Sequence, residues 1–501
     1  MGAITDLLTD RVSLPVLIVA GLLLLYVHHH TKGPLDGDAP LYKGSLPFMG
    51  AALEANSGLF KLLIGLKKKL GTVFSVYIMG DRMLVVTDHE SAVRQVFLQS
   101  AIFSSPDFIK GIDVKLFKYT KILIDNHWFV SKNLLHGIVA LLKSNDDMEN
   151  IMRVLRTVYR ESLSASAPKP VFAETETTVE LYRTLRTLMY NASSISLFGE
   201  EFPADGLLED FLLYEDHVMQ FLKGVPWFMN KGYNARERIL KKLAEFFEDP
   251  NRLANGQPLL KAIAAEFQAV DLEFTPTDMA SYFLSIMFAS KSNSVPLAFW
   301  MTGLVISKPE LKDNIYRIIK DNYDYDNNTI DWDAISANPL IVACWKETTR
   351  LCSSTAVGRL VMNDTKLKVG SDVYKVHAGQ TAMVMGSLIH WDENIYPDPM
   401  EYIPERFLKG SNSKYYNESV SEMKYTLIPF GGGAHLCPGR AVAFAEAVCQ
   451  LVYILWFFEV EIVGQPLRFG VEERFSSGAV KPSDEFNVKF TRRVEAPTPI
   501  N

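Results

Sequence analysis

The chain contains 501 residues, of which 48% are hydrophobic and 22% are charged, and this composition is typical of a globular protein. Its formal net charge is −7 and it has no long run of lysine or arginine, so a nucleic-acid partner is not expected. The cysteines, Cys344, Cys352, Cys437 and Cys449, give no disulfide framework and no Cys-x-x-Cys metal pair. We therefore expect a reducing compartment.

The N-terminal segment predicts a membrane anchor. Residues 12–27 are uncharged and mostly leucine, valine and isoleucine, with Arg11 before them and Lys32 after them. The run is somewhat short for a hydrocarbon core of roughly 30 Å, but the flanking basic side chains and a thinner endoplasmic-reticulum bilayer cover the difference. A cleaved signal peptide is one alternative, although no small-x-small cleavage site follows the run. A segment too polar to cross the bilayer is another.

The domain organisation follows from this anchor. We expect residues 1–30 to form a single transmembrane helix and residues 31–50, which include Pro34, Pro40 and Pro47, to form a stiff hinge. No Gly/Ser-rich or charged linker interrupts residues 51–501. We therefore expect one globular domain over that range.

Helical periodicity dominates the first two-thirds of the chain. Apolar residues recur at three- and four-residue spacing over residues 148–163, 181–197, 239–247 and 259–267, which predicts amphipathic helices. Strand patterns are fewer: a hairpin over residues 71–87 turning at Gly80–Asp81, a β region over residues 358–385, and short strands at residues 460–462 and 488–490. The sequence predicts a mainly α protein with small β-sheets.

Residues 279–306 predict one long apolar helix. The stretch Thr275-Pro276-Thr277-Asp278 supplies capping side chains at its start. Pro296 lies inside the run and is expected to kink the helix, because proline removes a backbone hydrogen bond.

Two short motifs carry opposite charges. Glu347 and Arg350 are three residues apart and so share one face of a helix, although such a pair is most often a solvated surface bridge. Arg406 follows in Pro404-Glu405-Arg406-Phe407, within a proline-punctuated segment. A carboxylate clamped between two guanidinium groups can bond bidentately to both.

The most specific motif is the glycine-rich stretch from Phe430 to Arg440, which contains Cys437 and precedes an alanine-rich helical run. Glycines let the backbone approach a ligand closely. The start of a helix stabilises a thiolate and lowers the thiol pKa. The pattern therefore suits a thiolate ligand held against a flat metal cofactor, and the alternative is a glycine-rich turn around a buried free cysteine.

In order and spacing, the three motifs resemble the cytochrome P-450 family. Phe430, Gly433, Cys437 and Gly439 match its haem-binding loop, with His435 where the family usually has arginine. The resemblance covers about the last two-thirds of the chain well. It implies the mainly α cytochrome P-450 fold, a haem b whose iron is axially ligated by Cys437, and a haem-thiolate catalytic domain over residues 51–501.

The same resemblance implies roles for further residues. Glu347, Arg350 and Arg406 would form a buried triad behind the haem loop. His435 and Arg359 would each bond a haem propionate, although Arg359 could also be a surface residue. Ala289, Thr355, Ala356 and Ala479 lie where family members line the substrate pocket, in small and mildly polar segments, which suits a bulky apolar substrate with a few oxygens.

The distal helix departs from the family pattern. Where family members carry an acid and an alcohol that relay protons, this chain has Ser292 and Asn293, which are the predicted catalytic residues. The departure resembles the subgroup with cholesterol 7α-hydroxylase, sterol 12α-hydroxylase and prostacyclin synthase, which carry asparagine, then proline and an aromatic pair like Phe299–Trp300. Asn293 can hold a water or orient a ligand oxygen; alternatively it only satisfies the backbone freed by Pro296.

These expectations define a leading function and two alternatives. The leading function is a membrane-anchored haem-thiolate monooxygenase of a sterol, terpenoid or other secondary metabolite. Because no Gly-x-Gly-x-x-Gly follows a strand pattern, electrons would come from NADPH through NADPH-cytochrome P-450 reductase, with cytochrome b5 as a further candidate partner. We expect the endoplasmic-reticulum membrane, a single membrane pass and a cytosolic catalytic domain in contact with lipid.

One alternative is a reductase-independent isomerase, dehydratase or cyclase acting on a peroxide or pre-oxidised lipid. The other is a haem-binding sensor or scaffold without turnover.

Overall fold

A computed structural model describes residues 36–46, 49–164, 172, 174–418, 420, 424–469, 478–494 and 497–500, together with Gly21. The chain divides into two compact units, one from residues 1–105 and 356–389 and the other from residues 106–355 and 390–501. Apart from Gly21, the predicted anchor over residues 1–30 lies outside the described residues.

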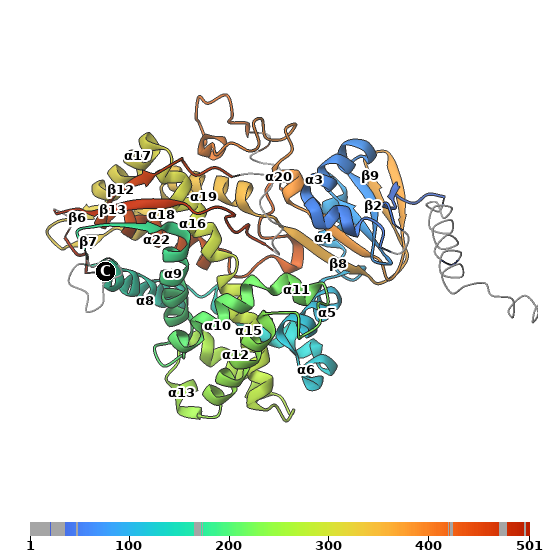
Figure 1. The fold of residues 1–501 in the computed structure, drawn as a ribbon, viewed down its shortest axis with the longest axis horizontal. Coiled ribbons are helices and arrows are strands. Elements are labelled where there is room, and N and C mark those ends of the chain that lie inside the picture. The colour runs from blue at the N-terminus through green and yellow to red at the C-terminus, as the bar shows by residue number, and fades with distance from the viewer. Residues whose placement is uncertain are drawn as a thin grey trace, which may run out of the picture. The chain divides into compact units, whose positions relative to one another are not determined.

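The smaller unit is built on a six-stranded sheet in the order β1-β2-β3-β11-β8-β4, of which β2 and β8 are labelled in Figure 1. The helix α3 packs against β2, and α4 packs against β9 and β11. A separate two-stranded sheet pairs β9 with β10. The elements are β1 (Leu41–Tyr42), α3 (Ala52–Leu70), β2 (Val73–Ile78), β3 (Asp81–Val86), α4 (Ala92–Leu98), β4 (Phe103–Ser104), β8 (Ala356–Val361), β9 (Thr365–Val369), β10 (Asp372–Val376), β11 (Thr381–Met385) and α20 (Ser387–His390).

The predicted hairpin is present, with its turn one residue early. β2 and β3 pair antiparallel from Val73 opposite Val86 to Ile78 opposite Asp81. The turn falls on Met79 and Gly80, whose φ angles are 53° and 93°, because a two-residue hairpin turn matches strand twist best when both residues have positive φ. The predicted β region over residues 358–385 is also confirmed, as strands β8 to β11.

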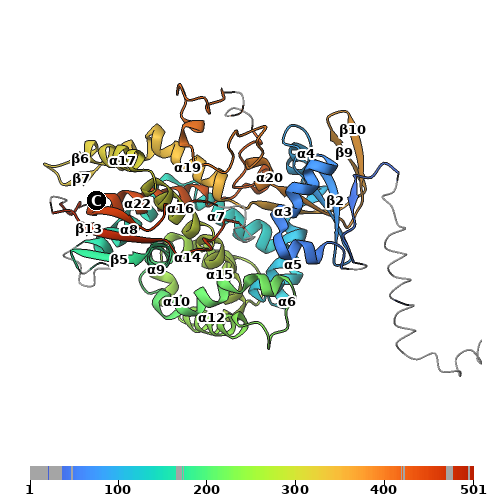
Figure 2. The same ribbon diagram turned by 45° about the horizontal axis from the view of Figure 1, so that its top comes forward.

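Helices make up most of the larger unit (Figure 2). Their bounds are α5 (Ser105–Phe117), α6 (Lys121–Asp125), the π-helical η1 (Phe129–Leu134), α7 (Leu135–Leu141), α8 (Asn145–Leu163), α9 (Leu181–Phe198), α10 (Ala204–Asp216), α11 (Val218–Leu222), α12 (Gly232–Phe247), α13 (Pro250–Ala254), α14 (Pro258–Ala269), α15 (Pro276–Lys291), α16 (Ser294–Ile306), α17 (Pro309–Asp321), α18 (Trp332–Ala337), α19 (Pro339–Cys352), the 3-10 turns η2 (Pro404–Phe407) and η3 (Gly433–His435), and α22 (Arg440–Phe457).

The four periodic segments predicted as helices lie within α8, α9, α12 and α14. The helix α12 begins at Gly232, seven residues before the predicted start at residue 239. Its first turns are mostly polar, yet they bury Ala235 and Arg236. The sequence prediction missed these first turns because they contain few apolar residues, although one face of them is buried.

Two short sheets complete the larger unit. β12 (Phe458–Val463) pairs antiparallel with β13 (Asn487–Arg492), which pairs with β5 (Glu176–Glu180). The first two contain the strands predicted near residues 460–462 and 488–490. β6 (Tyr323–Asp324) and β7 (Thr329–Ile330) form a small hairpin.

The interior of the larger unit centres on α16 and α22. All residues of α16 are buried, and α22 packs against α16, α8 and α17. Among the described residues, α22 is the helix long and apolar enough to cross a membrane, and 78% of it is buried within the protein. That burial is typical of a core helix.

The long helix expected over residues 279–306 is two helices. α15 starts with a capping box between Thr275 and Asp278, as the sequence predicted, and ends at Lys291. α16 begins at Ser294. Pro296 lies in the first turn of α16, where backbone N–H groups have no partner within the helix, so it starts a new helix rather than kinking a continuous one.

Candidate active site

The loop around Cys437 is shaped by its glycines. Gly431 and Gly433 have φ angles of 73° and 70°, a backbone region that side chains with a Cβ rarely adopt. The Cys437 N–H donates to the Phe430 carbonyl at 3.0 Å, which closes the loop. α22 begins at Arg440, so the half-buried Cys437 precedes a helix start.

Burial raises the pKa of the Cys437 thiol, while the backbone N–H groups of Gly439 and Arg440 and the charge of Arg440 lower it. The expected helix-start effect is therefore present, but desolvation outweighs it. A metal ion would reverse that balance, because metals bind the deprotonated thiolate.

Three side chains, those of Thr355, Trp345 and His390, contact the segment that leads into this loop. Thr355 Oγ1 donates to the Pro429 carbonyl at 3.0 Å, and the ring of Trp345 stacks on Phe430 with centroids 6.2 Å apart. The fully buried His390 accepts a hydrogen bond from the Ile428 N–H at its Nε2. Burial and the nearby Arg350 lower the pKa of His390 to about 3, so it is a neutral structural group.

Glu347, Arg350 and Arg406 meet in the interior, each 3% exposed or less. Arg350 binds the carboxylate bidentately, with Nε to Oε2 at 2.7 Å and Nη2 to Oε1 at 2.8 Å. Arg406 makes one contact, from Nε to Oε1 at 3.2 Å, rather than the two that its fork would allow. The backbone N–H of Ile403 also donates to Oε1.

The two arginines hold the chain that leads to the loop. Arg350 Nη1 donates to the carbonyls of His390 and Pro399, both at 2.7 Å. Arg406 Nη2 donates to the Asp398 carbonyl at 2.8 Å. The charge cluster therefore fixes the segment between residues 390 and 406, which otherwise has little regular structure.

The break between α15 and α16 places Ser292 and Asn293. Asn293 makes no side-chain capping bond to α16; its Oδ1 accepts from the Ala479 N–H at 2.9 Å. The side-chain oxygen of Asn293 is therefore bonded to the backbone of residue 479 and not to the backbone at the start of α16. Ser292 is 6% exposed, and its hydroxyl lies near the Glu215 carboxylate without the geometry of an ordinary hydrogen bond.

Residues 478–480, which we call the C-terminal segment, are anchored at every position. The Gly478 carbonyl accepts from Ser354 N and Oγ, and the Val480 carbonyl accepts from Trp300 Nε1 at 2.7 Å. A Cβ on Gly478 would lie 1.8 Å from Asn293 Oδ1, so only glycine allows this approach. The predicted pocket residue Ala479 thus lies directly against the break.

The remaining predicted pocket residues lie on separate elements. Ala289 is exposed on α15, and Thr355 is 8% exposed at the end of the segment after α19. Ala356 begins β8 in the smaller unit. The structure brings Asn293 and Ala479 into contact, and ties Thr355 to the chain before Cys437.

Arg359 also lies on β8, facing away from the side of Ala356 because strand residues alternate. Its guanidinium is 3% exposed, donates to the Gly358 carbonyl, and lies over the Phe97 ring. Burial lowers the pKa of Arg359 to about 10, and among the described residues no carboxylate forms an ion pair with it. A buried guanidinium without an acid is the expected binding group for an anion such as a propionate.

Sequence reasoning missed two charged groups near the break. Glu215, on α10, is 8% exposed and forms ion pairs with Arg186 and with Lys481. Burial alone would raise the pKa of Glu215, but these cations lower it below its ordinary value. The second group is Lys291 with Glu446, each 1% exposed. The sequence did contain a signal for Lys291 and Glu446, because each is a single charged residue within an apolar stretch.

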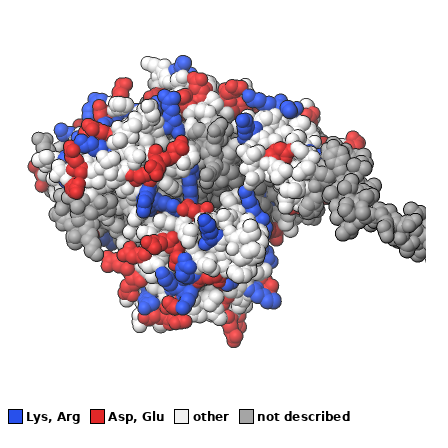
Figure 3. Space-filling model, viewed as in Figure 1, with Lys and Arg blue, Asp and Glu red and all other residues white. Residues whose placement is uncertain are grey.

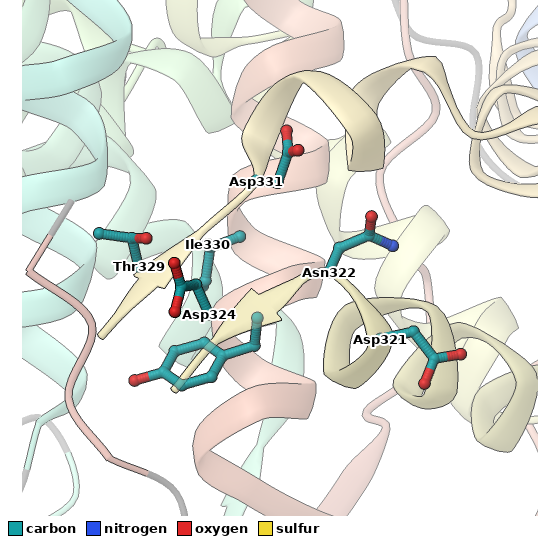
Figure 4. A pocket seen from close by; sticks show the side chains of 7 residues that line it. Asp321, Asn322, Asp324, Thr329, Ile330 and Asp331 are labelled. Carbon is teal, nitrogen blue, oxygen red and sulfur yellow. The ribbon is translucent and has the colours of Figure 1, made fainter. Parts of the chain in front are cut away.

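A surface hollow of about 450 Å³ lies elsewhere in the larger unit (Figure 4). It is lined by Asp321, Asn322, Tyr323, Asp324, Thr329, Ile330 and Asp331. Asp324 already accepts bonds from the backbone of Asp326 and Asn327. None of the predicted site residues lines this hollow, and we assign no function to it.

Comparison with known proteins adds the following. A sequence model of the family described as Cytochrome P-450 matches residues 40–490. A cholesterol 7-alpha-monooxygenase from Cricetulus griseus is 24% identical over 485 residues, covering 91% of this chain and 93% of that protein. A human 7-alpha-hydroxycholest-4-en-3-one 12-alpha-hydroxylase is 23% identical over 497 residues, covering 95% and 97%. A 5-beta-cholestane-3-alpha,7-alpha-diol 12-alpha-hydroxylase from Sus scrofa is 23% identical over 507 residues, covering 96% and 98%.

Proposed function

Because this chain belongs to the cytochrome P-450 family, whose cofactor is haem bound through a cysteine thiolate, we propose that it is a monooxygenase of a sterol, terpenoid or similar lipophilic metabolite. The proposal rests mainly on hydrogen bonds that connect the predicted distal break, the predicted pocket segments and the predicted haem loop. The break at Asn293 is bonded to the C-terminal segment, the C-terminal segment is bonded to Ser354, and Thr355 is bonded to the chain before Cys437.

We assign cofactor binding to the Cys437 loop. Cys437 fits as the iron ligand because it is the cysteine in a glycine-rich loop before a helix, whereas Cys344, Cys352 and Cys449 are buried within helices. Arg359 and His435 would bind the propionates, and Phe430, Gly433 and Gly439 would shape the loop. When bound, haem activates O2, and the thiolate raises electron density at the iron.

The chain's own residues position the substrate. The fixed C-terminal segment and Thr355 present small side chains, which leave room for a bulky apolar ligand. Asn293 uses its Oδ1 on Ala479, so the Nδ2 amide can donate to a substrate or water oxygen. That the relatives are named as hydroxylases of cholesterol and its derivatives supports a sterol-like substrate.

Electrons would come from NADPH through NADPH-cytochrome P-450 reductase, with cytochrome b5 as a second candidate donor. On the face shown in Figure 3, basic and acidic side chains are intermixed. Lys409 and Lys414 precede the Cys437 loop and Arg440 directly follows it, and all three are exposed. Such cations suit an acidic electron-transfer partner.

The decisive experiment offers membranes containing the protein a panel of sterols, terpenoids and lipid peroxides. Reactions run with and without NADPH, reductase and O2, and products are followed by mass. We expect a product heavier by one oxygen atom only with the complete electron supply. Product of unchanged mass, or lighter by one water, formed without NADPH would instead establish an isomerase, dehydratase or cyclase.

That second function has one observation in its favour. Neither Ser292 nor Asn293 is an acid, so the family's usual proton-relay pair is absent from the break. An enzyme that rearranges a peroxide has to orient the substrate oxygens, and it depends less on a residue that delivers a proton to bound oxygen. The same product assay separates the two functions.

We predict that Asn293→Ala lowers product formation about tenfold or more while haem content stays near normal, because the C-terminal segment loses its acceptor and the substrate loses a donor. Asn293→Asp, which keeps the acceptor oxygen, is the matched control for segment anchoring. If both variants retain full product formation, Asn293 has no part in substrate handling.

Asn293→Thr gives the complementary test. If a missing alcohol limits proton delivery in a monooxygenase, this variant should raise the product formed per O2 consumed. A large loss of product without loss of haem would assign Asn293 to substrate orientation instead.

We further propose an endoplasmic-reticulum location, with residues 1–30 as a single-pass anchor and a cytosolic catalytic domain. A second lipid contact is supported by Trp227, Phe228 and Met229, between α11 and α12, which are 64%, 70% and 63% exposed. Exposed aromatic clusters of this kind mark interfaces, and tryptophan favours the headgroup region.

Deleting residues 1–30 is therefore expected to release only part of the protein from membranes, as measured by flotation. Adding Trp227→Ser and Phe228→Ser should release most of the remainder. Complete release by the deletion alone would rule out the second contact. The matched control is Tyr325→Ser, at an exposed ring between β6 and β7, which should change nothing.

A further inference from the structure

Two apolar stretches of the larger unit each contain a single charged residue. In residues 279–306, which cover most of α15 and all of α16, it is Lys291, and in residues 441–458, which cover most of α22, it is Glu446. Each is 1% exposed. Burying a charge is costly unless it is paired and hydrogen-bonded, so both residues need a physical explanation.

Lys291 ends α15, and its ammonium group faces α9. The Nζ atom lies 5.4 Å from the ring centre of Tyr190 and 4.9 Å from that of Phe198. Its hydrogen bond goes to Ser290 Oγ at 3.4 Å, which is long. Among the described residues no carboxylate is close enough for a direct ion pair with it.

Glu446 faces the same interior from α22. Both of its carboxylate oxygens are buried, and the hydroxyls of Ser193 and Ser294 approach them without the geometry of an ordinary hydrogen bond. The hydroxyls of Ser193 and Tyr190, three residues apart on α9, are also buried without a hydrogen bond of ordinary geometry to a described protein group. α16 packs against both α9 and α22 (Figure 1), so these polar atoms share one region.

Buried polar groups are nearly always hydrogen-bonded, and where protein partners are absent, ordered water supplies the bond. These four atoms lack a hydrogen bond of ordinary geometry, and with the ammonium group they provide the two to four polar partners that an internal water needs. We propose that Lys291 and Glu446 enclose an internal water site behind the Ser292–Asn293 break and act together as a positioning pair for that break.

The site would connect two elements on which the proposed function depends. Lys291 directly precedes Ser292, and Glu446 follows Cys437 by nine residues on the helix that starts at its loop. A water-bridged pair would therefore fix the break relative to α22. The water site itself does not depend on the proposed function; its effect on turnover does.

Ionisation supports this assignment. Burial lowers the pKa of Lys291 to about 7, although Glu446 and Glu215 raise it. Burial raises the pKa of Glu446 to about 7, although Ser193, Ser294 and Lys291 lower it. Tyr190 faces Lys291, and Tyr159 and Cys449 face Glu446, but burial raises the pKa of each of these three groups further above neutrality.

The signs of the two shifts define a pH signature. The lowered pKa of Lys291 destabilises the fold fully below pH 7, and this cost declines as the pH rises toward the unfolded value of about 10.4. The raised pKa of Glu446 destabilises the fold fully above pH 7, and this cost declines as the pH falls toward about 4.3. The summed cost is therefore greatest near pH 7.

The first test measures denaturant unfolding of the purified holoenzyme and of the double variant Lys291→Met with Glu446→Gln. We expect the variant to be the more stable protein, with the largest gain near pH 7 and smaller gains at pH 5 and pH 9. Glu215→Gln is the matched control: because ion pairs lower the pKa of Glu215, its loss should destabilise the protein with no maximum near pH 7. A gain that does not peak near pH 7 would overturn the proposal.

The second test examines positioning directly. A crystal structure of the holoenzyme should show ordered water between Lys291 Nζ and the Glu446 carboxylate, and dry packing there would overturn the proposal. In the product assay each single variant should lower product per NADPH consumed about tenfold at unchanged haem content. The double variant should lose no more than either single one, because the pair acts as a unit; multiplied losses would contradict it.

The two proposals fail differently. If the wild-type enzyme turns over without NADPH, the monooxygenase is wrong, yet the pH signature and the bridging water are still expected. If the wild-type enzyme is a monooxygenase but stability shows no such signature, the positioning pair is wrong.

Discussion

Cys437→Ser is expected to abolish the red-shifted absorbance band of the reduced carbonyl complex that is characteristic of thiolate-bound haem, and to reduce product formation to background. Serine keeps the size and loop position of the residue, so the fold should survive. Its hydroxyl is too weak an acid to replace the thiolate, and the electron density that the thiolate supplies to the iron would be lost. Difference spectroscopy on dithionite-reduced membranes measures the band.

Cys449→Ala is the matched control. Cys449 lies on α22, the helix that begins three residues after Cys437. It is 3% exposed and burial raises its pKa, so it is an unreactive core residue. Its replacement should leave the band in place with a modest loss of stability. If the band survives Cys437→Ser, the ligand is another residue and the site built around this loop is wrong.

Motifs with fixed local spacing were predictable, and contacts between distant segments were not. Glu347 and Arg350 share a helical turn, so their pairing follows from i,i+3 geometry. The bond between Asn293 and Ala479 joins residues 186 apart, and no spacing rule indicates it. Residue patterns predicted Asn293 as a catalytic residue and Ala479 as a pocket residue, but only the folded structure shows that the two are hydrogen-bonded to each other.

The break in the distal helix shows a second limit. A proline inside an apolar run indicates that the run is interrupted, but it removes the N–H that would bond one turn earlier. The discontinuity therefore falls before Pro296, at Ser292 and Asn293. The apolar pattern also did not explain Lys291 and Glu446. Such a pattern predicts that a helix is buried, but it does not predict which groups a charged residue within that helix contacts.

The charge cluster of Glu347 should be the most sensitive point of the fold. Glu347→Gln would leave Arg350 and Arg406 buried with no carboxylate, and breaking a buried ion pair in this way costs about 3–5 kcal/mol. The usual stability of a folded protein is about 5–15 kcal/mol, so little folded holoprotein should accumulate. Haem content and the denaturant midpoint should fall together, because Arg350 and Arg406 also hold the carbonyls of residues 390, 398 and 399.

Glu405→Gln is the matched control for that loss. Glu405 belongs to the same turn as Arg406, is half-buried, and forms no ion pair among the described residues, so its replacement should stay within about 0.5 kcal/mol of the parent. Turnover per bound haem in whatever Glu347→Gln protein survives should be close to normal, because the cluster acts on the fold and not on the substrate. If Glu347→Gln instead keeps full haem content and loses turnover per haem, then Glu347 takes part in catalysis rather than in folding.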